Sequence, residues 1–573
     1  MKTIYFLFFV FSISYAHCQT NTIGAIKNTP EALDGYTLFA PLLGYHTYLI
    51  NNCGEEINKW THAAESRFSV ELTEDGYLLR SAEASGASPL GTTGGKAGRL
   101  EKVDWNNNVV WSYDYISAVQ SDSGQYISHH DFELLPNGNI LLLVWENQPA
   151  SVLAEHGMHS SFNHDYMWME KIIEIEPVGL NGANIVWEWN IFDHLIQDND
   201  PSRHNYGVVE NNPHRFDINK KRSSGYVKDL FHANSIDYNA ELDQILITIK
   251  HQGEIWIIDH STTTEEAKTS SGGLRGKGGD LLYRWGNPAT YKVSTGGQKL
   301  HNPHHAEWIP EGYKDAGKIT IYNNGNHFFS IPSKAAIIDP HMNADGSYPV
   351  PNPGETFLPN SFHWEYQMNL DIVQPGHISD QLSGLYRLDN GNTLICNGLF
   401  AGYFIELDSN DNIVWEYYSP IGAREHLDTI LTQGESYATG LFERTDVYRA
   451  VKYKPNFIGF LGKDLTPGDP LELDPYPNAC TLYPDSTLEP LSIEVAALNV
   501  SINNPITSKL NIINTNEEEL IIQIYNVSGQ SIYSTRESNG LISIDAETWN
   551  QGLYFIRVTT QDSRRFEHKI IKL

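Results

Sequence analysis

The chain has 573 residues, of which 12% are aromatic and 19% are charged, and it contains 45 glycines. This length exceeds one ordinary domain, although repeat folds can run long as single units, and the composition favours a β-rich globular protein with many turns. The net charge of -31 excludes a general nucleic-acid binder, because a polyanion is bound by a positive surface. A small anionic substrate is still allowed, since a local pocket can oppose the overall field.

Residues 1–18 have the pattern of a secretory signal peptide. Lys2 supplies the positive charge, residues 4–13 form a short apolar run, and small residues precede a cleavage point near Ala16–Cys18. A lipoprotein signal that ends in a lipidated cysteine is the alternative, although His17 is a poor residue before such a cysteine. No apolar run in the chain is long enough to span a membrane, so we expect an exported protein without a membrane span.

The cysteines limit the disulfides that the mature chain can form. If Cys18 is removed or modified, the three that remain are Cys53, Cys396 and Cys480. An odd number allows one disulfide at most and leaves a free thiol, and the pairing stays open. No Cys-x-x-Cys motif occurs, which argues against a thiolate zinc site.

A recurring pattern organises most of the chain. Asn-Gly or Asp-Gly turns lead into apolar strands, which is a strong hairpin signal, and later strands end in a tryptophan at positions 60, 111, 187, 285, 364 and 415. The shortest spacing suits a four-stranded blade of roughly 40–50 residues, and longer spacings indicate loop insertions. We therefore predict an all-β fold with a six-bladed β-propeller over residues 30–465, in which each tryptophan packs between neighbouring blades. Short strands that end in tryptophan also occur in other β proteins.

The composition changes after the predicted propeller. Residues 466–494 are rich in Pro, Asp, Leu and Thr without clear periodicity and are predicted to be a linker. From residue 495 to residue 573, short alternating strands such as Leu520–Val527 and Gly552–Val558 predict a small C-terminal β-sandwich.

Histidines stand before three predicted strands. They are the pair His129 and His130, the single His232, and the pair His304 and His305. The first strand of each propeller blade lines the central channel, so we expect these positions to meet at one mouth of that channel. Such a cluster can bind a metal, supply a nucleophile with an acid or base, or be structural. The absence of a compact motif such as His-Glu-x-x-His weakens the metal interpretation.

Several of these stretches together resemble the bacterial arylsulfotransferase family. They are His129-His-Asp-Phe-Glu133, Phe231-His-Ala-Asn-Ser-Ile-Asp-Tyr238, Lys250-His-Gln252, and His304-His-Ala-Glu-Trp308 with the later Asn323-Asn-Gly325. The resemblance spans roughly residues 35–455. It implies an exported six-bladed propeller that moves a sulfuryl group from a phenolic sulfate ester to a phenolic acceptor. It also implies no nucleotide sulfate donor, no metal and no other cofactor.

The resemblance assigns roles to individual residues. It places the nucleophile, which would form a sulfo-histidine, on His304 and further catalytic histidines on His232 and His130, with His305 and His129 as the alternatives within each pair. Lys250 stands where the family usually has an arginine, and a lysine offers a point charge instead of a planar fork. The amides of Asn234 and Asn324 are candidates for binding the sulfuryl oxygens, although asparagines are also common turn residues.

The C-terminal residues 495–573 resemble the type A sorting domain of the type IX secretion system. The resemblance rests on Ser501–Ile512, Ile524–Gly529, Gly552–Val558 and the basic end Lys569–Leu573. It implies a Gram-negative source, an interaction with the type IX machinery, and transport through the periplasm to the cell surface or medium. A metal-dependent hydrolase or lyase and a non-catalytic binding propeller are the rival functions, and a homodimer is an open possibility.

Overall fold

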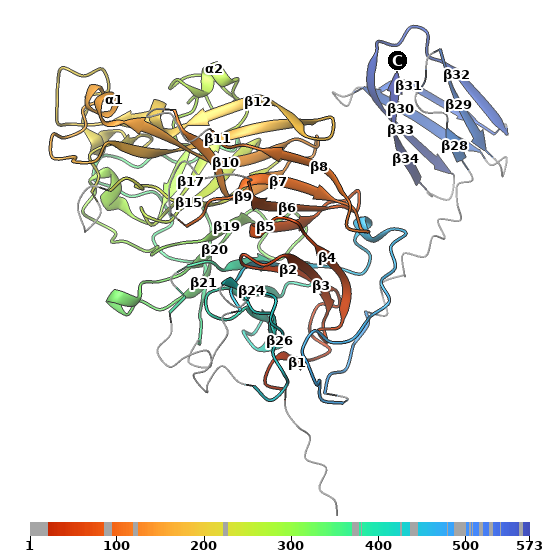
Figure 1. Ribbon diagram of the computed structural model, residues 1–573. Coiled ribbons are helices and arrows are strands. Elements are labelled where there is room, and N and C mark those ends of the chain that lie inside the picture. The colour runs from red at the N-terminus through yellow and green to blue at the C-terminus, as the bar shows by residue number, and fades with distance from the viewer. Residues whose placement is uncertain are drawn as a thin grey trace, which may run out of the picture. The chain divides into compact units, whose positions relative to one another are not determined.

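The computed structural model describes most of the chain, and it is dominated by β-strands (Figure 1). The described residues are 21–84, 94–117, 124–221, 227–369, 378–379, 381–424, 427–435, 445–477, 479–485, 500–502, 506, 508–514, 519–526, 531–538, 540–560 and 565–572. The predicted signal peptide, residues 1–18, lies outside them. The chain divides into two compact units, residues 1–485 and residues 486–573.

The described part of the first unit contains six larger antiparallel sheets in chain order. Three consist of β27 (Val447–Tyr453), β2 (Tyr36–Pro41), β3 (His46–Asn51) and β4 (Glu56–Thr61); of β5 (Ser66–Leu72), β6 (Leu78–Glu83), β7 (Gly98–Val103) and β8 (Val109–Asp114); and of β9 (Tyr126–Leu134), β10 (Ile140–Pro149), β11 (Tyr166–Val178) and β12 (Gly182–Asn190). The other three consist of β15 (Ala233–Asn239), β16 (Gln244–Ile249), β17 (Glu254–Asp259) and β18 (Tyr283–Trp285); of β19 (His305–Trp308), β20 (Ile319–Asn323), β21 (Lys334–Ile338) and β22 (Trp364–Gln367); and of β23 (Gly384–Arg387), β24 (Thr393–Asn397), β25 (Tyr403–Leu407), β26 (Ile413–Tyr418) and β1 (Gly24–Asn28).

Smaller elements lie in the connections between strands and after β27. They are the helices α1 (Ala150–Glu155) and α2 (Thr264–Ala267), the parallel pair β13 (Leu195–Ile196) and β14 (Phe216–Asp217), and the 3-10 turns η1 (Ile191–His194), η2 (Val209–Asn211), η3 (Pro288–Tyr291), η4 (His327–Phe329) and η7 (Ile458–Phe460). No helix among the described residues has the length and apolar character that crossing a membrane requires.

The first strands of the six sheets form a closed ring. β5 contacts β9, β9 contacts β15, β15 contacts β19, β19 contacts β23, β23 contacts β27, and β27 contacts β5. The ring is closed by both ends of the unit, because β27 pairs with β2 and β1 pairs with β26. Residues that precede these inner strands therefore become neighbours although they are far apart in sequence.

The predicted tryptophans lie in the outermost strand of the consecutive sheets, except where β1 adds a further strand beyond β26. Each donates its indole N–H to the next sheet around the ring. The bonds run from Trp60 to the Asp104 carbonyl (2.9 Å), Trp111 to Gly182 O (2.9 Å), Trp187 to Thr262 Oγ1 (3.2 Å), Trp285 to Pro359 O (2.8 Å), Trp364 to Asp411 Oδ1 (3.0 Å) and Trp415 to Asn52 O (2.8 Å). The prediction that these rings pack between neighbouring sheets is thereby confirmed.

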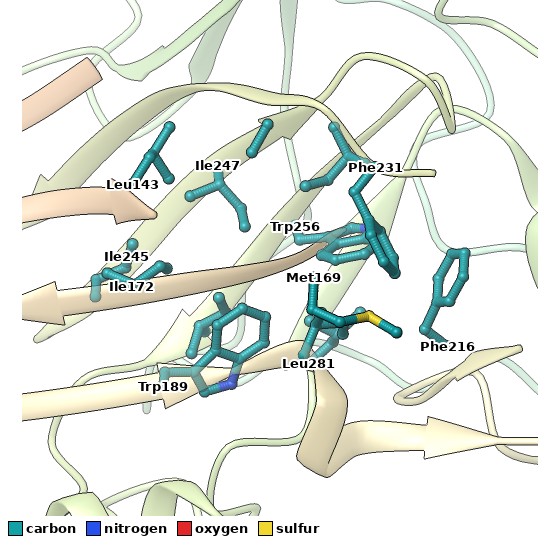
Figure 2. Close-up of a cluster of buried hydrophobic side chains, with 14 of the residues drawn as sticks. Leu143, Met169, Ile172, Trp189, Phe216, Phe231, Ile245, Ile247, Trp256 and Leu281 are labelled. Atoms are coloured by element: carbon teal, nitrogen blue, oxygen red, sulfur yellow. The ribbon is translucent and has the colours of Figure 1, made fainter. Parts of the chain in front are cut away.

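The largest apolar cluster lies between the third and fourth sheets (Figure 2). Leu143 from β10, Met169 from β11 and Trp189 from β12 meet residues of β16 and β17 there. Phe231, which is 1% exposed, packs against Trp256 and Phe216 in the same cluster. Because Phe231 directly precedes His232, this core fixes the backbone from which His232 projects.

The residues of the first unit that follow β27 contact its sheets. Cys53 and Cys480 form a disulfide, and Cys396 on β24 is a buried free thiol. Pro470 forms a β-bridge with Glu55, and Leu473 forms one with Thr432. The N-terminal part of the segment predicted as a linker is therefore held against the sheets.

The described strands of the second unit form two antiparallel sheets. One comprises β28 (Val500–Ile502), β29 (Lys509–Asn514) and β32 (Leu541–Asp545), and the other comprises β31 (Ser531–Glu537), β30 (Leu520–Asn526), β33 (Gly552–Thr560) and β34 (Arg565–Lys572). Side chains of both sheets share one apolar cluster that includes Leu510, Ile544, Ile522 and Ile556. The second unit thus has a core of its own.

Replacing Trp60 with Phe should lower the free energy of unfolding of the first unit by about 1–3 kcal/mol. The variant loses the hydrogen bond to Asp104 and part of a fully buried ring. Urea unfolding monitored by circular dichroism measures the change. Trp364→Phe is the matched control, because its partner Asp411 is solvent-accessible, and it should lose less; an equal loss in both variants would contradict the role given to the buried bond.

Candidate functional site

The structure brings the three predicted histidine stretches to the ring of inner strands. His130 lies on β9, His232 directly precedes β15, and His304 directly precedes β19. The rings of His130 and His232 are 4.8 Å apart between centroids. The charges of His232 and Lys250 act on His304. Three separate parts of the chain thus contribute to one polar site.

Two of these histidines have an unusual backbone conformation. His130 has φ of 47° and His232 has φ of 57°, in the left-handed region that side chains other than glycine rarely adopt. The pairing register of β9 shifts around His130, and that of β15 shifts just after His232, between Ala233 and Ser235. Such bulges re-aim a side chain and are common beside functional sites.

Glycine is required next to His130. Gly95 has φ of 102°, and its carbonyl accepts the backbone N–H of His130 at 2.9 Å. A Cβ atom at position 95 would lie 2.1 Å from Cε1 of the His130 ring. The backbone of this segment therefore covers one side of the histidine, and a larger residue would displace the ring.

His304 is held by two acceptors on the same ring nitrogen. Its Nδ1 lies 2.9 Å from the carbonyl of Asn302 and 3.0 Å from Oδ1 of Asn324. The Asn324 amide nitrogen donates to the carbonyls of Ser379 and Leu382, which fixes the orientation of the amide and leaves Oδ1 to face the imidazole. Nδ1 must therefore carry the proton, and the lone pair of the neutral ring is on Nε2.

His130 is oriented through its neighbour. Glu170 accepts the Nε2–H of His129 at 3.0 Å, and Nδ1 of His129 lies 3.0 Å from Nδ1 of His130. Because His129 donates through Nε2, its Nδ1 accepts, and His130 donates through Nδ1. Trp145 stacks on His129 with 4.0 Å between centroids. His129 thus supports His130, and a regular strand, whose neighbouring side chains point to opposite faces, would not allow this contact.

His232 has a carboxylate partner. Its Nδ1 donates to Oδ2 of Asp229 at 2.6 Å, and its ring stacks on His251 with 4.5 Å between centroids. All three site histidines therefore hold a proton on Nδ1 through a local acceptor. Each neutral ring has its basic lone pair on Nε2, the tautomer that serves a nucleophile or a proton acceptor.

Burial keeps two of the histidines neutral. It lowers the pKa of His304 well below its ordinary value, and the charges of Lys250 and His232 lower it further. Burial likewise lowers the pKa of His130 well below its ordinary value, with His232 as the largest charge effect. A neutral imidazole is the nucleophilic form.

Arg449 connects the strands that carry the site, although the sequence motifs did not indicate it. This residue of β27 is 8% exposed, and it donates to Oδ2 of Asp131 at 2.6 Å, to the carbonyl of Asn234 at 2.9 Å and to the carbonyl of His304 at 3.3 Å. The hydroxyl of Tyr448 also donates to the Asn234 carbonyl. An arginine in an apolar strand carries no local pattern that would reveal such partners.

The remaining predicted residues are placed differently. The side-chain oxygen of Asn234 accepts from Thr248, so this amide oxygen is not directed at a ligand. Nδ1 of His305 accepts the backbone N–H of Leu385 at 3.1 Å, and its ring contacts Tyr386 at 4.7 Å. His305 therefore lies apart from the group around His304.

Three residues join the site that the sequence analysis did not assign to it: Asp229, Glu170 and His251. The position of His251 next to Lys250 was the only sequence signal for any of them.

Asp229, His232 and His251 are close enough to be examined as metal ligands, since their ligand atoms lie within 4.8 Å of one another. Their geometry favours a hydrogen-bonded group instead. The two imidazole planes are only 24° apart, and ring lone pairs lie in those planes, so the lone pairs run side by side instead of converging on one ion. Nδ1 of His232 is also at hydrogen-bonding distance from the carboxylate.

Further along the inner strands lies a cavity of about 590 Å³ with an acidic lining. Glu71, Glu133, Asp237 and Glu307, one from each of four consecutive inner strands, all line it. Burial, reinforced by the neighbouring carboxylates, raises the pKa of Glu71 to about 7 and that of Glu133 well above its ordinary value. Glu133 follows His130 by three residues, so the four carboxylates lie about 10 Å along the strands from the histidines.

These raised pKa values predict that the first unit loses stability as the pH rises. A carboxyl whose pKa is raised on folding contributes stability that is fully present below its unfolded pKa and is lost as the pH rises through the folded value, here about 7 for Glu71. Glu71→Gln should remove the contribution of this residue, so the pH dependence becomes weaker and the free energy of unfolding at pH 8 rises by about 1–2 kcal/mol. Urea unfolding at pH 5 and pH 8 measures it.

Glu74→Gln is the control for this prediction, because Glu74 lines the same cavity but is exposed. It should leave the pH dependence unchanged. A Glu71→Gln variant that is less stable than the parent at pH 8 would contradict the electrostatic account.

Two family models match the chain. Residues 115–336 match the model described as "Arylsulfotransferase (ASST)", and residues 503–573 match the "Secretion system C-terminal sorting domain". Both resemblances predicted from the motifs are confirmed. The first match contains His130, His232, Lys250 and His304 and supports an enzyme of the sulfotransferase type. The second indicates a type IX cargo that is secreted or displayed at the cell surface.

Comparison with curated proteins gives no match, and the similar solved structures are distant. A protein of unknown function from Bacteroides caccae is 11% identical, with 74% of this chain and 99% of that chain covered and a TM-score of 0.36. The periplasmic gluconolactonase PpgL of Pseudomonas aeruginosa is 8% identical, with 90% and 99% covered and a TM-score of 0.32. The β-propeller domain of Cps50 (Swd1) from Myceliophteria thermophila is 10% identical, with 64% and 90% covered and a TM-score of 0.28.

Proposed function

We propose that the protein is an aryl sulfate sulfotransferase. It would move a sulfuryl group from a phenolic sulfate ester to a phenolic acceptor through a sulfo-histidine on His304, without PAPS or another nucleotide donor. The observation that carries this proposal is the state of His304: its Nδ1 proton is held by Asn302 and Asn324, and its neutral ring lies within the electrostatic reach of Lys250 and His232. The arylsulfotransferase match over the same residues supports it.

In the first half-reaction, Nε2 of His304 attacks the sulfur of the donor. The S–N bond forms, the bond from sulfur to the phenolic oxygen breaks, and the leaving phenolate takes a proton from His232 or Lys250. Charge on the sulfuryl oxygens must be stabilised throughout, much as in phosphoryl transfer. The ammonium of Lys250 is suited to that role, with Asn324 holding the nucleophile in place.

In the second half-reaction, an acceptor phenol loses its proton and attacks the same sulfur. The new S–O bond forms, the S–N bond breaks, and His304 returns as a neutral imidazole. Donor and acceptor thus use one site in turn, and the kinetics should be ping-pong. The reaction needs no redox partner and no metal.

The proposal includes the boundaries and the type of each domain. We interpret the six ring-forming sheets as a six-bladed β-propeller over residues 30–465, the described contacts of residues 466–485 as the start of a connection that runs to residue 494, and residues 495–573 as a β-sandwich read by the type IX secretion machinery. Residues 1–18 would be the signal peptide. The proposed substrates are small molecules, and the proposal includes neither nucleic acid nor a membrane span.

Two rival functions remain to be separated by experiment. A metal-dependent hydrolase or lyase would purify with a tightly bound stoichiometric metal, which elemental analysis detects. A non-catalytic binding propeller would turn over no chromogenic aryl sulfate in the presence of a phenol. The stacked arrangement of His232 and His251 argues against the first rival, and the strained backbone at His130 and His232 argues against the second.

Mixing the protein with an aryl sulfate should give a sulfuryl adduct on the peptide that contains His304, detected by mass spectrometry. His304→Ala should lose the adduct and lower turnover by about 10³-fold or more, because it removes the proposed nucleophile. His305→Asn is the matched control, since the asparagine oxygen can still accept the Leu385 N–H, and it should keep the adduct. If the adduct persists in His304→Ala and disappears in His305→Asn, the nucleophile is His305 and not His304.

Lys250→Arg should keep or raise the rate of transfer, whereas Lys250→Met should lower kcat by about 10²–10³-fold, the usual effect of removing one group that stabilises an oxyanion. The planar fork of arginine can bind two sulfuryl oxygens at once. Steady-state kinetics with one donor and one phenol measure both variants. Unchanged kcat in Lys250→Met would show that this cation does not contact the sulfuryl group.

A further inference from the structure

Asp229 holds two histidines of the site at once. Its carboxylate accepts the Nδ1–H of His232 at 2.6 Å, and its backbone carbonyl accepts from Nδ1 of His251 at 2.9 Å. The two imidazoles stack with 4.5 Å between centroids and planes 24° apart. His251 thus covers one face of the His232 ring while Asp229 fixes its edge.

The backbone on either side of Asp229 is anchored. A β-bridge joins Asp229 to Trp168 on β11, and the Trp168 N–H donates to the carbonyl of Lys228 at 2.9 Å. On the other side, Gln252 donates to the carbonyl of Leu230 at 2.6 Å. The carboxylate is therefore positioned by two sheets, in contrast to an exposed surface aspartate.

We propose that Asp229 and His251 are positioning residues that make His232, and not Lys250, the proton carrier of sulfuryl transfer. The inference rests on the proposed function and deepens it. In the first half-reaction, His232 begins as imidazolium and gives its Nε2 proton to the leaving phenolate as the S–O bond breaks. In the second, the same Nε2 takes the proton of the acceptor phenol as the new S–O bond forms, so the protons balance over one cycle.

The surrounding charges support this division of roles. Asp229, His251 and His130 contact the His232 ring. Lys250 donates its backbone N–H to the His232 carbonyl, and the charge of His232 acts on His304. Asp229 contributes the negative charge among them and stabilises the imidazolium form. Lys250 adds a positive charge that suits the sulfuryl oxygens, and a lysine that pairs with those oxygens as an ammonium throughout the cycle would exchange no proton. The carboxylate also selects the ring tautomer in which Nε2 is the exchanging atom.

Asp229→Asn tests the inference, because the amide keeps the size of the carboxylate, removes its charge and can favour the other tautomer. With donors whose leaving phenols are weakly acidic, kcat should fall by about 10²–10⁴-fold, the range of positioned acid–base catalysis. With donors whose leaving phenols are strongly acidic, the loss should be much smaller, since such leaving groups need no proton. The dependence of kcat on the acidity of the leaving phenol therefore becomes steeper.

The pH profile gives a second readout that a merely structural role would not move. The alkaline limb of kcat, at which the imidazolium loses its proton, should shift to lower pH in Asp229→Asn. His251→Phe keeps an aromatic ring against His232 but loses the bond to the Asp229 carbonyl, so it should show a smaller change in the same direction. Circular dichroism and the midpoint of thermal unfolding establish that each variant is folded.

The adduct on His304 separates failure of this inference from failure of the proposed function. Asp229→Asn should still form the sulfuryl adduct with a strongly activated donor. If the parent protein forms the adduct, and Asp229→Asn loses activity equally with all donors without a shift of the pH limb, the inference is overturned. If Asp229→Asn is fully active, it is overturned as well. If the parent protein forms no adduct with any donor, the proposed function itself fails.

Discussion

The guanidinium group of Arg449 is the interaction on which the geometry of the site depends. It is buried on the strand that closes the ring, and it reaches Asp131 on β9, the carbonyl of Asn234 on β15 and the carbonyl of His304 before β19. A buried cation is costly unless it is paired and hydrogen-bonded. Burial is the largest effect and acts against its charge, but Asp131 together with Tyr448 and Tyr386 outweighs burial and holds the pKa of Arg449 above its ordinary value. The strand that closes the ring therefore also aligns the strands that carry the histidines.

The repetitive parts of the fold could be predicted because their signals are local. Each strand that ends in tryptophan, and each Asn-Gly turn, is a short pattern whose meaning does not depend on distant residues. Six similar patterns in one order indicate repeated sheets, and the indole bonds between consecutive sheets explain why tryptophan recurs at that place. The approximate grouping of His130, His232 and His304 followed from the same reasoning, because each was predicted to stand just before an inner strand. His232 and His304 do so, whereas His130 lies within β9.

The details of the site could not be predicted because they depend on irregular backbone and distant partners. Regular alternation along a strand would place His129 and His130 on opposite faces, whereas the left-handed conformation of His130 lets the two rings share a hydrogen bond. The partner of Arg449, Asp131, lies 318 residues away. Residues 466–485 have no periodic pattern, so their sequence did not indicate that they contact the sheets or that Cys480 pairs with Cys53. Such features are fixed by the assembled ring.

The inner strands combine two unfavourable features that point to function and not to stability. His130 and His232 adopt strained backbone conformations at one position along the inner strands. Further along the same strands, the carboxyl groups of Glu71, Glu133, Asp237 and Glu307 line one cavity. Strain and like charge each lower stability, and a ring that is closed by strand pairing at both ends and bridged by the indole bonds can tolerate both. The histidines, however, differ from the carboxylates in one respect. Each has a dedicated acceptor for its Nδ1 proton, drawn from an amide, a carboxylate or another imidazole. Three unlike partners that impose the same tautomer are better explained by a shared need for Nε2 than by packing, since packing alone places no demand on which nitrogen carries the proton.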